Sequence, residues 1–476
     1  MSHLPRLIVS ALSGGAGKTI LSLGLARQWR RKGLSVKPFK KGPDYIDAVW
    51  LGRAAGQTAT NLDPFFMQDR ILARLFAEQA DGCDVALVEG NRGLFDGKDT
   101  NGSCSTSHLA RLLQCPVLLI LDCSKMTRTI APIVQGCSWF EKGLVLAGVI
   151  LNRTAGARHR NILRKCVEEY TDVPVLGALP KLDDTLIPER HMGLVSDREY
   201  AAEEAIEESA RILADWVDVE GILRMADLAP ELDTPDIALW PEVQSVDPVV
   251  RIGVVKDASL WFYYPENLQA LERAGAELAE VSLLDPGEEW PKIHGLYLGG
   301  GFPEMQAEGL AANTATKKLV RTLAQKGLPI YAECGGLMYL CSSLTTDADT
   351  VYNMVDLFPL RTGLSAKPQG HGYTRCTVRR SNPFFSVGEE FIGHEFHYSR
   401  CYPSEGEDVP SCLEMNRGTG LGGGRDGLLY KNTLACYNHI HALSVPSWAE
   451  NFVRAARMYK QALDRGETVC PQIAAG

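Results

Sequence analysis

The chain has 476 residues, which at about 150 residues per domain corresponds to two large domains or three ordinary ones. Its composition, 45% hydrophobic and 22% charged, is that of a globular protein and excludes collagen-like, low-complexity and disordered chains. The 58 acidic residues outnumber the 49 basic ones and give a net charge of −9, which argues against a non-specific nucleic-acid binder.

The N-terminal segment MSHLPRLIVSALSGGAGKT lacks the apolar stretch and the cleavage site of a signal peptide. No run approaches the roughly 18 apolar residues that a membrane span needs. The 13 cysteines are scattered and form no CxxC pair, so we expect neither a disulfide framework nor a zinc ribbon. The sequence therefore predicts a cytoplasmic protein with reduced thiols and no membrane partner.

Residues 1–226 alternate short apolar runs with helical stretches. An apolar strand is expected at Leu7–Leu12, and an amphipathic helix at Ile20–Gly33 follows it after a Gly-rich turn. Further short runs typical of buried parallel strands are Val85–Val88, Val117–Leu121 and Leu146–Leu151. The alternation predicts a doubly wound α/β domain that closes with an acidic amphipathic helix over Ala201–Ala226.

A second domain is expected at residues 249–476, after a linker at 227–248 that holds four prolines and little periodicity. Its elements are expected as a strand from Arg251 (RIGVV), a helix near Pro265–Ala274, a strand at Gly295–Leu298, a helix after Pro303 and a strand at Pro329–Ala332. The stretch Tyr352–Asn438 is richer in aromatics and glycine, which favours β structure. Two α/β domains are therefore predicted.

A Gly-rich turn between the first strand and the first helix predicts a nucleotide site. Residues 13–19 read SGGAGKT, and their backbone N–H groups and the following helix N-terminus are suited to hold phosphates. The candidate ATP-binding residues are Gly14, Gly15, Gly17, Lys18 and Thr19, with Thr19 also a ligand of Mg²⁺. The match is partial, because the full pattern has glycine where Leu12 stands. Partitioning-type ATPases carry a lysine at the place of Ser13, which weakens that alternative.

Carboxylates follow two of the predicted elements close to this turn. Glu89 ends a buried strand at the carboxyl edge of the sheet, where sites of open α/β sheets lie, and is a candidate Mg²⁺ ligand. Asp96 lies on the next loop, where a role in the turn is the simpler explanation. A further loop, residues 40–47 (KKGPDYID), brings two lysines and two carboxylates together with Gly-Pro and Tyr, more than a solvated turn requires.

Cys334 stands apart from the other cysteines. Residues 328–338 (LPIYAECGGLM) predict a strand, a sharp turn and a helix, the geometry that exposes a nucleophile at a sheet edge with backbone N–H groups free to hold an oxyanion. A helix N-terminus and a nearby imidazole favour the thiolate. A second donor loop is available at residues 299–304 (GGGFPE). The best source of the imidazole is His439-Ile440-His441.

Longer segments of both halves resemble one known family, the glutamine-dependent cobyrinic acid a,c-diamide synthases, over essentially the whole chain. The strongest matches in the first half are FKKGPDYIDAVW (Phe39–Trp50), NLDPFFM (Asn61–Met67), EGNRGLFDG (Glu89–Gly97) and ERHMGLV (Glu189–Val195). In the second half they are FYYPENLQALERAGAEL (Phe262–Leu278), GLYLGGGFPE (Gly295–Glu304), ECGGLMYL (Glu333–Leu340) and GHEFHYS (Gly393–Ser399). Together these segments are highly specific.

The resemblance implies an N-terminal synthetase domain similar to dethiobiotin synthetase, which uses ATP and Mg²⁺ to phosphorylate a tetrapyrrole carboxylate. Substrate-binding roles are implied for Lys41, Asp44, Tyr45, Asp47 and Asp96, and metal ligation for Thr19, Asp44 and Glu89. Asn152 is a candidate reader of the adenine edge. Further cations for the carboxylates of the macrocycle are Lys40, Arg153, Arg158, Arg160 and Arg190.

The resemblance also implies a C-terminal class I glutaminase domain, in which Cys334 attacks the glutamine amide and releases ammonia. The broad class carries His-Pro-Glu where this chain has His-Ile-His. The diamide synthases share this departure, so the resemblance implies a Cys-His dyad with His439 as the base and His441 as the runner-up. Oxyanion donors are expected at Gly300, Gly301 and Gly335. The partners are then glutamine and a tetrapyrrole polycarboxylate, and we allow for a homodimer.

The macrocycle itself stays open. Many members read Glu-Gly-Val-Met-Gly-Leu-Tyr-Asp-Gly where this chain has Asn91-Arg92 in the middle, and close relatives amidate nickel-sirohydrochlorin or siroheme. Cobyrinic acid and hydrogenobyrinic acid are the other candidates. A cobyric acid synthase would be expected to end in a Tyr-Leu-His-Gly motif, which the His-Ile-His sequence opposes. A partitioning-type ATPase that acts as a binding module would need no elbow cysteine, and a catalytically dead scaffold would not keep both sets of site residues.

Overall fold

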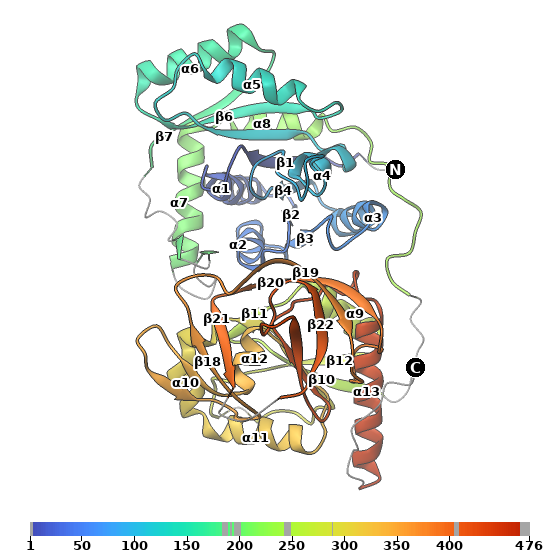
Figure 1. Cartoon of the computed structure of the whole chain (residues 1–476). Coiled ribbons are helices and arrows are strands. Elements are labelled where there is room, and N and C mark those ends of the chain that lie inside the picture. The colour runs from blue at the N-terminus through green and yellow to red at the C-terminus, as the bar shows by residue number, and fades with distance from the viewer. Residues whose placement is uncertain are drawn as a thin grey trace. The chain divides into compact units, whose positions relative to one another are not determined.

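The computed structural model describes residues 3–182, 189–190, 193–194, 201–241, 249–287, 289–403 and 409–466; at 189–190, 193–194 and 201 it describes the backbone only. The chain divides into two compact units, residues 1–239 and 240–476, each described by itself below (Figure 1). The division falls within the proline-rich stretch 227–248.

The first unit is built on a seven-stranded parallel sheet in the order β3-β2-β4-β1-β5-β6-β7. Its strands are β1 (Arg6–Ala11), β2 (Val36–Lys41), β3 (Thr60–Leu62), β4 (Val85–Glu89), β5 (Val117–Asp122), β6 (Leu146–Thr154) and β7 (Val175–Pro180). Strand β1 lies in the middle, between β4 and β5, where the strand order changes direction. Open α/β sheets bind their ligands beyond the carboxyl ends of the strands at such a point.

Helices lie on both sides of this sheet, with α1 and α2 on one side and α3 and α4 on the other (Figure 1). The helices are α1 (Lys18–Arg31), α2 (Tyr45–Ala55), α3 (Asp69–Ala80), α4 (Thr106–Leu112), α5 (Ile130–Trp139), α6 (Ala157–Tyr170), α7 (Ala201–Trp216) and α8 (Val219–Asp227). A two-stranded antiparallel ribbon is formed by β8 (Glu189–Arg190) and β9 (Gly193–Leu194). The predicted doubly wound parallel-sheet fold is confirmed.

Two local predictions in this unit are wrong. The single helix expected over Ala201–Ala226 is two helices, because Val217 bridges to Gly177 of β7 and the Asp218 carboxylate accepts a hydrogen bond from Gly221 N–H, which caps a new helix. The charged segment 40–47 is not one loop. It runs from the end of β2 through a short turn into the first residues of α2.

The second unit contains a nine-stranded mixed sheet in the order β12-β10-β13-β15-β24-β23-β22-β19-β20. The parallel part is β12 (Ala276–Val281), β10 (Val250–Val255), β13 (Gly295–Leu298), β15 (Ile330–Glu333) and β24 (Thr433–Cys436). The antiparallel part is β23 (Arg425–Tyr430), β22 (Ser411–Arg417), β19 (Gly370–Val378) and β20 (Glu390–His397). The predicted β-rich stretch forms this second part and most of a smaller sheet.

The smaller sheets and the helices complete the unit. The smaller sheets are β17 (Val351–Asn353), β16 (Cys341–Thr345), β18 (Phe358–Leu364) and β21 (Ser399–Pro403), and the pair β11 (Leu260–Phe262) and β14 (Gly300–Gly301). The helices are α9 (Pro265–Arg273), a 3-10 turn (Pro303–Gln306), α10 (Ala307–Ala312), α11 (Thr314–Gln325), α12 (Gly335–Leu340) and α13 (Ser447–Asp464).

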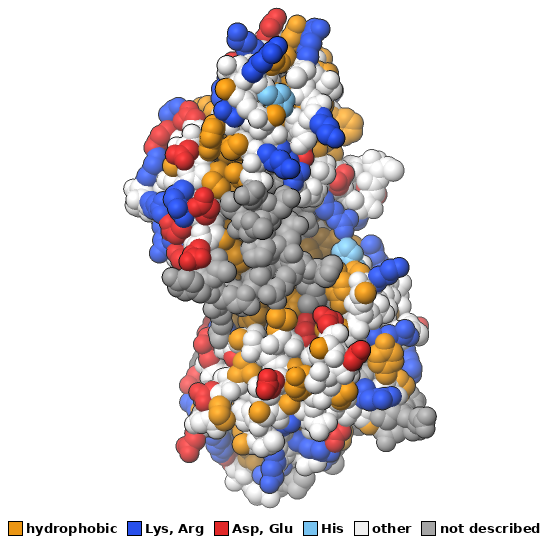
Figure 2. All heavy atoms as spheres, turned by 90° about the vertical axis from the view of Figure 1, so that its left-hand side faces the viewer, with side chains coloured by type: hydrophobic (Ala, Val, Ile, Leu, Met, Phe, Trp, Pro, Cys, Tyr) orange, Lys and Arg blue, Asp and Glu red, His pale blue; other side chains and the backbone are white. Residues whose placement is uncertain are grey.

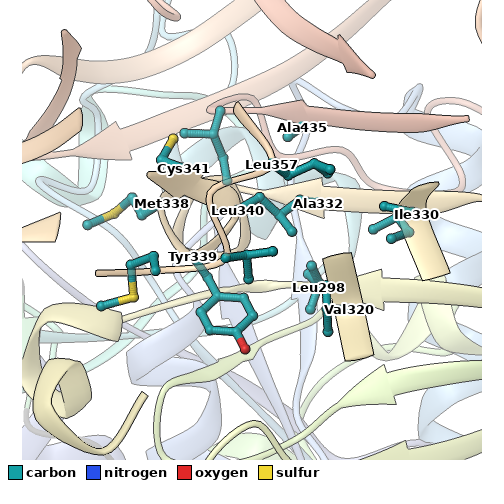
Figure 3. Packing of buried hydrophobic residues seen from close by; sticks show 14 of the residues in the cluster. Leu298, Val320, Ile330, Ala332, Met338, Tyr339, Leu340, Cys341, Leu357 and Ala435 are labelled. Carbon is teal, nitrogen blue, oxygen red and sulfur yellow. The ribbon is translucent and has the colours of Figure 1, made fainter. Parts of the chain in front are cut away.

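Helix α12 lies in the core of the second unit. It has six residues, all buried, and side chains from β13, β15 and β24 surround it, as Figure 3 shows for Leu298, Ile330 and Ala435. A helix this short is marginal by itself in water, so tertiary packing rather than helix propensity holds it. Burial of each large apolar side chain stabilises the fold by about 1.5–3 kcal/mol. The core that holds α12 therefore also fixes Cys334, the residue directly before the helix.

The surface carries charges of both signs side by side. On the face in Figure 2, Lys and Arg side chains and Asp and Glu side chains are scattered among uncharged ones. In the first unit, ion pairs of this kind join α1 to α7, including Arg27 with Glu203 and Glu207. Within the described ranges, no helix is both long enough and apolar enough to cross a membrane.

Candidate active sites

The Gly-rich turn of the first unit joins β1 to α1 as predicted and takes a backbone form that only glycine adopts readily. Gly17, directly before α1, has φ 99°, and a Cβ there would lie 2.6 Å from the amide nitrogen of Asn152. Asn152, at the carboxyl edge on β6, donates a hydrogen bond of 2.8 Å to the carbonyl of Ala16. The predicted adenine reader therefore supports the turn itself in this structure, and its contact with adenine stays a prediction.

Lys18 bends back over the turn. Its Nζ donates to the carbonyl oxygens of Ser13, at 3.0 Å, and Arg92, at 2.9 Å. Burial lowers the pKa of the Lys18 ammonium, and the nearby carboxylate of Glu89 opposes that shift. A phosphate oxygen would give this ammonium a charged partner in place of two neutral carbonyls, which makes the turn a site prepared for an anion.

A buried cluster of opposite charges lies beside Lys18. Lys40, at the end of β2, donates to Glu89 Oε1 at 2.7 Å and forms a short contact with Asp47. Burial favours the neutral amine, but the carboxylates of Asp47 and Glu89 outweigh it and hold the pKa of Lys40 above its usual value. Lys40 thus stays charged and connects α2 to the strand that ends in Glu89.

Asp44 is held by two adjacent elements. Its carboxylate caps α2 by accepting from Asp47 N–H at 2.8 Å, and Asn61 fixes its carbonyl at 2.9 Å. Desolvation, with the neighbouring carboxylate of Asp47, raises the pKa of Asp44 to about 7, partly offset by Lys40. A cation near Asp44 would relieve this unfavourable charge.

The predicted Mg²⁺ ligands Thr19 and Glu89 are neighbours. The Thr19 hydroxyl donates to Glu89 Oε1 at 3.2 Å, and Glu89 Oε2 is buried without a hydrogen-bond partner among the described residues. Burial raises the pKa of Glu89, which Lys40 opposes. No cluster of three or more His, Cys, Asp or Glu able to hold a metal alone occurs in the described part of the chain. The donors fit Mg²⁺ that takes its remaining ligands from phosphates and water.

The other predicted substrate residues surround the same edge. Lys41 is buried, and burial lowers its pKa while Asp63 opposes the shift. Tyr45 is also buried, at the start of α2. Asp96 accepts from Gly93 N–H at 3.0 Å, the contact expected of a turn former.

The predicted arginines differ in position. Arg153 pairs with Asp122 at 2.6 Å and donates to the carbonyl of Gly15 at 3.1 Å, so it lies at the phosphate turn. Arg160 stacks over Trp216, with its guanidinium carbon 4.7 Å from the ring centroid. Arg158 begins α6. The side chain of Arg190 lies outside the described residues.

In the second unit Cys334 occupies the predicted elbow between β15 and α12. Its φ of 45° and ψ of −97° are unusual for a residue with a side chain, and its N–H is held by the carbonyl of Cys436 at 2.7 Å. Such strain persists only where the surrounding structure fixes it, and it is frequent at nucleophiles. The buried strand and the buried helix on either side provide that restraint.

The predicted oxyanion donors come together at this elbow. A Cβ on Gly335 would lie 3.0 Å from the backbone nitrogen of Gly301, and one on Gly300 would lie 2.6 Å from Cε1 of His439. Gly301 has φ 156°, and its strand β14 pairs with β11. Glycines at these positions allow the two backbone segments and the imidazole to approach one another closely.

His439 and His441 make different contacts. Nδ1 of His439 lies 3.1 Å from Glu333 Oε2, and both side chains are buried. Nε2 of His441 lies 3.5 Å from Glu266 Oε2, also buried. Each imidazole therefore faces a different carboxylate.

The Cys334 thiol needs a proton acceptor. Burial, with the carboxylates of Glu304 and Glu333, raises its pKa well above the usual range, and the N–H of Gly335 opposes the shift only in part. An isolated thiol in this place would stay protonated at neutral pH and would be a poor nucleophile. The base at the site is therefore essential to any chemistry of Cys334.

For two residues of these sites, the contacts in the structure differ from what the sequence predicts. Lys40, expected as one more cation for the substrate, instead holds Glu89 and Asp47. Glu333 receives no role although it contacts His439. For Glu333 the signal is a charged residue at the end of an apolar run, LPIYAE, whereas VKPFKK holds three lysines and gives no such signal for Lys40.

The fold and the two sites define a glutamine amidotransferase domain and a nucleotide-binding domain in one chain. Residues 7–195 match the CobQ/CobB/MinD/ParA nucleotide binding domain, and residues 251–446 match the CobB/CobQ-like glutamine amidotransferase domain.

Full-length relatives narrow this class to one family. The cobyrinate a,c-diamide synthase of Magnetococcus marinus is 41% identical over 458 residues, which is 95% of this chain and 97% of that protein. Proteins of the same name from Archaeoglobus fulgidus and Salmonella typhimurium are 37% and 36% identical, over 96% and 94% of this chain and 98% of each relative. The chain belongs to the cobyrinate a,c-diamide synthase family.

Proposed function

We propose that the chain is an ATP- and glutamine-dependent ligase that amidates the a- and c-acetate carboxylates of cobyrinic acid. The observation that carries the proposal is the presence in one chain of a phosphate turn with Lys18 and an elbow at Cys334, with His439 paired to Glu333, the residue directly before the cysteine. The names of the full-length relatives supply the substrate. A cytoplasmic location and a homodimer stay predictions.

The first unit activates the carboxylate. The turn at Gly14, Gly15 and Gly17 holds the phosphates of ATP, and Lys18 leaves its carbonyl partners to neutralise the transferred group. Thr19, Glu89 and Asp44 would hold Mg²⁺, which supplies further neutralisation of phosphate charge. A substrate carboxylate oxygen takes the γ-phosphoryl group and ADP leaves. The acyl phosphate that results has a leaving group that a free carboxylate lacks.

The second unit supplies the nitrogen. His439 takes the proton of the Cys334 thiol, and the sulfur attacks the side-chain amide carbon of glutamine. The oxyanion is held by backbone N–H groups of the elbow and of the Gly300–Gly301 strand. The C–N bond then breaks, the leaving nitrogen receives the proton from His439, and ammonia is released. Water hydrolyses the thioester to glutamate and restores the thiol. Ammonia displaces phosphate from the acyl phosphate and forms the amide.

Other sirohydrochlorin-derived macrocycles are the second candidate substrates, and Arg92 is the observation that favours testing them. Its side chain is exposed beside the phosphate turn, and its backbone carbonyl accepts from Lys18. A panel of cobyrinic acid, hydrogenobyrinic acid, nickel-sirohydrochlorin and siroheme, each with ATP, Mg²⁺ and glutamine, tests the proposal by the mass change of each product. Cobyrinic acid should gain two amides. If only a different macrocycle of the panel is amidated, that macrocycle replaces cobyrinic acid as the proposed substrate. If none of the four is amidated, the proposed function is rejected.

Replacing Asp44 with asparagine should reduce amidation at least about tenfold while leaving the fold as stable as before, or more stable at pH 8. Asparagine still caps α2, but the charge is gone. Because the pKa of Asp44 in the folded chain, about 7, exceeds the usual 3.8, ionisation of Asp44 lowers the free energy of unfolding as the pH rises through that range. Urea unfolding of the protein without nucleotide at pH 5 and pH 8 measures this difference.

The matched control is Asp218→Asn, which changes the exposed cap of α8 in the same way. It should leave amidation unchanged. An Asp44→Asn protein that amidates at the normal rate would reduce Asp44 to a helix cap.

Replacing Arg92 with methionine, the residue that many family members carry there, should raise the KM for the macrocycle about tenfold. The expected loss is that of one charge-assisted hydrogen bond to a substrate carboxylate. Arg92 has φ 53°, which methionine tolerates no worse than arginine, so backbone strain does not change. Steady-state kinetics with varied macrocycle measure the effect, with Arg211→Met on α7 as control. An unchanged KM would remove Arg92 from substrate binding.

A further inference from the structure

Glu333 immediately precedes the elbow cysteine and is the last residue of β15. Its side chain is fully buried, and its Oε2 lies 3.1 Å from Nδ1 of His439, whose side chain is 3% exposed. Since β15 pairs with β24 through Glu333 and Cys436, the carboxylate and the nucleophile are fixed by the same strand. A rigid element therefore places both at once.

The contact determines which nitrogen of His439 carries the proton. A carboxylate accepts hydrogen bonds, so Nδ1 is the donor and Nε2 is left to accept the proton of a thiol. The N–H of His439 donates to the carbonyl of His394 at 2.8 Å, and the carbonyl of His439 accepts from the N–H of His394 at 3.0 Å. The two imidazole rings stack with their centroids 4.9 Å apart. The imidazole thus has a fixed backbone, a fixed plane and a fixed tautomer.

Glu333 is itself held by groups other than His439. Its Oε1 lies 3.4 Å from the backbone nitrogen of Ile440, and burial, with the nearby carboxylate of Glu333, raises the pKa of the Tyr297 hydroxyl. Tyr297 in turn accepts from Asn267 at 3.3 Å, and Asn267 receives the N–H of Ala442 at 2.7 Å. The carboxylate is therefore positioned before any substrate binds.

His441 cannot take the place that glutamate has in the His-Pro-Glu motif, because it is engaged elsewhere. Its Nδ1 accepts from the N–H of Leu443 at 3.3 Å, and its Nε2 faces Glu266 at 3.5 Å. The carboxylate next to the base comes from the residue before the nucleophile instead.

We propose that Glu333 is the positioning residue of a Cys334–His439–Glu333 triad, which replaces the dyad predicted from the sequence; this rests on the proposed glutaminase function. Glu333 keeps the proton on Nδ1 and stabilises the imidazolium that forms when His439 takes the proton of the thiol. No bond to Glu333 is made or broken during the reaction.

The test compares Glu333→Gln and Glu333→Asp with the control Glu266→Gln, which alters an equally buried carboxylate beside the other imidazole. Three measurements are made on the full chain. They are kcat/KM for glutamine, amidation with ammonium chloride, and the pH dependence of iodoacetamide inactivation of the glutamine-dependent activity.

Glu333→Gln should lower kcat/KM for glutamine by about 10²-fold or more and leave ammonium-driven amidation unchanged. The pH midpoint of inactivation should rise by about one unit, because the imidazolium that pairs with the thiolate is less stable without the carboxylate. Glu333→Asp keeps the charge and should fall between the two. Glu266→Gln should leave the midpoint in place.

An unmoved midpoint and a rate within threefold of the wild type in Glu333→Gln would overturn the triad. An equal shift in Glu266→Gln would also overturn it, because the effect would then be one of general charge in the core. If Glu333→Gln does not fold, Glu333→Asp decides, and a wild-type rate and midpoint there would reject the proposal. Failure of the proposed function is distinct: the wild-type chain itself would then release no ammonia from glutamine.

Discussion

Replacing Lys18 with alanine should abolish amidation with glutamine and with ammonium alike, a loss of at least about 10²-fold for each. Phosphoryl transfer depends mainly on positioning and on neutralising charge. The Lys18 ammonium bends over the turn, where it donates to two neutral carbonyl oxygens. Without it no acyl phosphate forms, so the source of nitrogen does not matter. Product from each nitrogen source, measured by mass, gives the result.

Glutamine hydrolysis by the same variant should proceed, since the elbow belongs to the other unit. Lys32→Ala is the matched control, because Lys32 follows α1 and forms a surface ion pair with Glu220, which contributes at most about 1 kcal/mol. Ammonium-driven amidation near the wild-type rate in Lys18→Ala would exclude the phosphate turn from the mechanism.

Both sites could be predicted from the sequence to the extent that local pattern determines them. The strand, turn and helix around Lys18 and around Cys334 each follow from an apolar run, glycines and an amphipathic stretch, and the structure has both. Glycine positions such as Gly300 could also be predicted, because a close approach of backbone and imidazole excludes any side chain.

The parts that could not be predicted depend on contacts between distant residues. The strand VKPFKK reads as polar, yet Lys40 is buried because Glu89 and Asp47 neutralise it from two other elements. Glu333 and His439 are 106 residues apart in sequence, and the carboxylate reaches the imidazole only after β15 and β24 pair. The spacing of these residues along the chain does not indicate either contact.

Replacing Cys334 with serine should reduce glutamine-dependent amidation by at least about 10³-fold and preserve amidation by concentrated ammonium at raised pH. Serine keeps the size and the elbow, but its hydroxyl has a pKa far above the working pH and cannot replace the thiolate. Carboxylate activation uses none of the atoms of Cys334. The comparison of amide formed from glutamine and from ammonium chloride measures this separation.

The two histidines extend the same comparison. His439→Ala should behave like Cys334→Ser, because His439 is the proposed acceptor for the thiol proton and the thiol alone has a raised pKa. His441→Ala should lose much less with glutamine, since His441 faces Glu266 and the backbone of Leu443 rather than Glu333. Equal losses with both nitrogen sources would mean that Cys334 supports folding rather than glutamine chemistry. A larger loss for His441→Ala than for His439→Ala would reverse the choice of base, and Glu266 would then be the carboxylate that positions it.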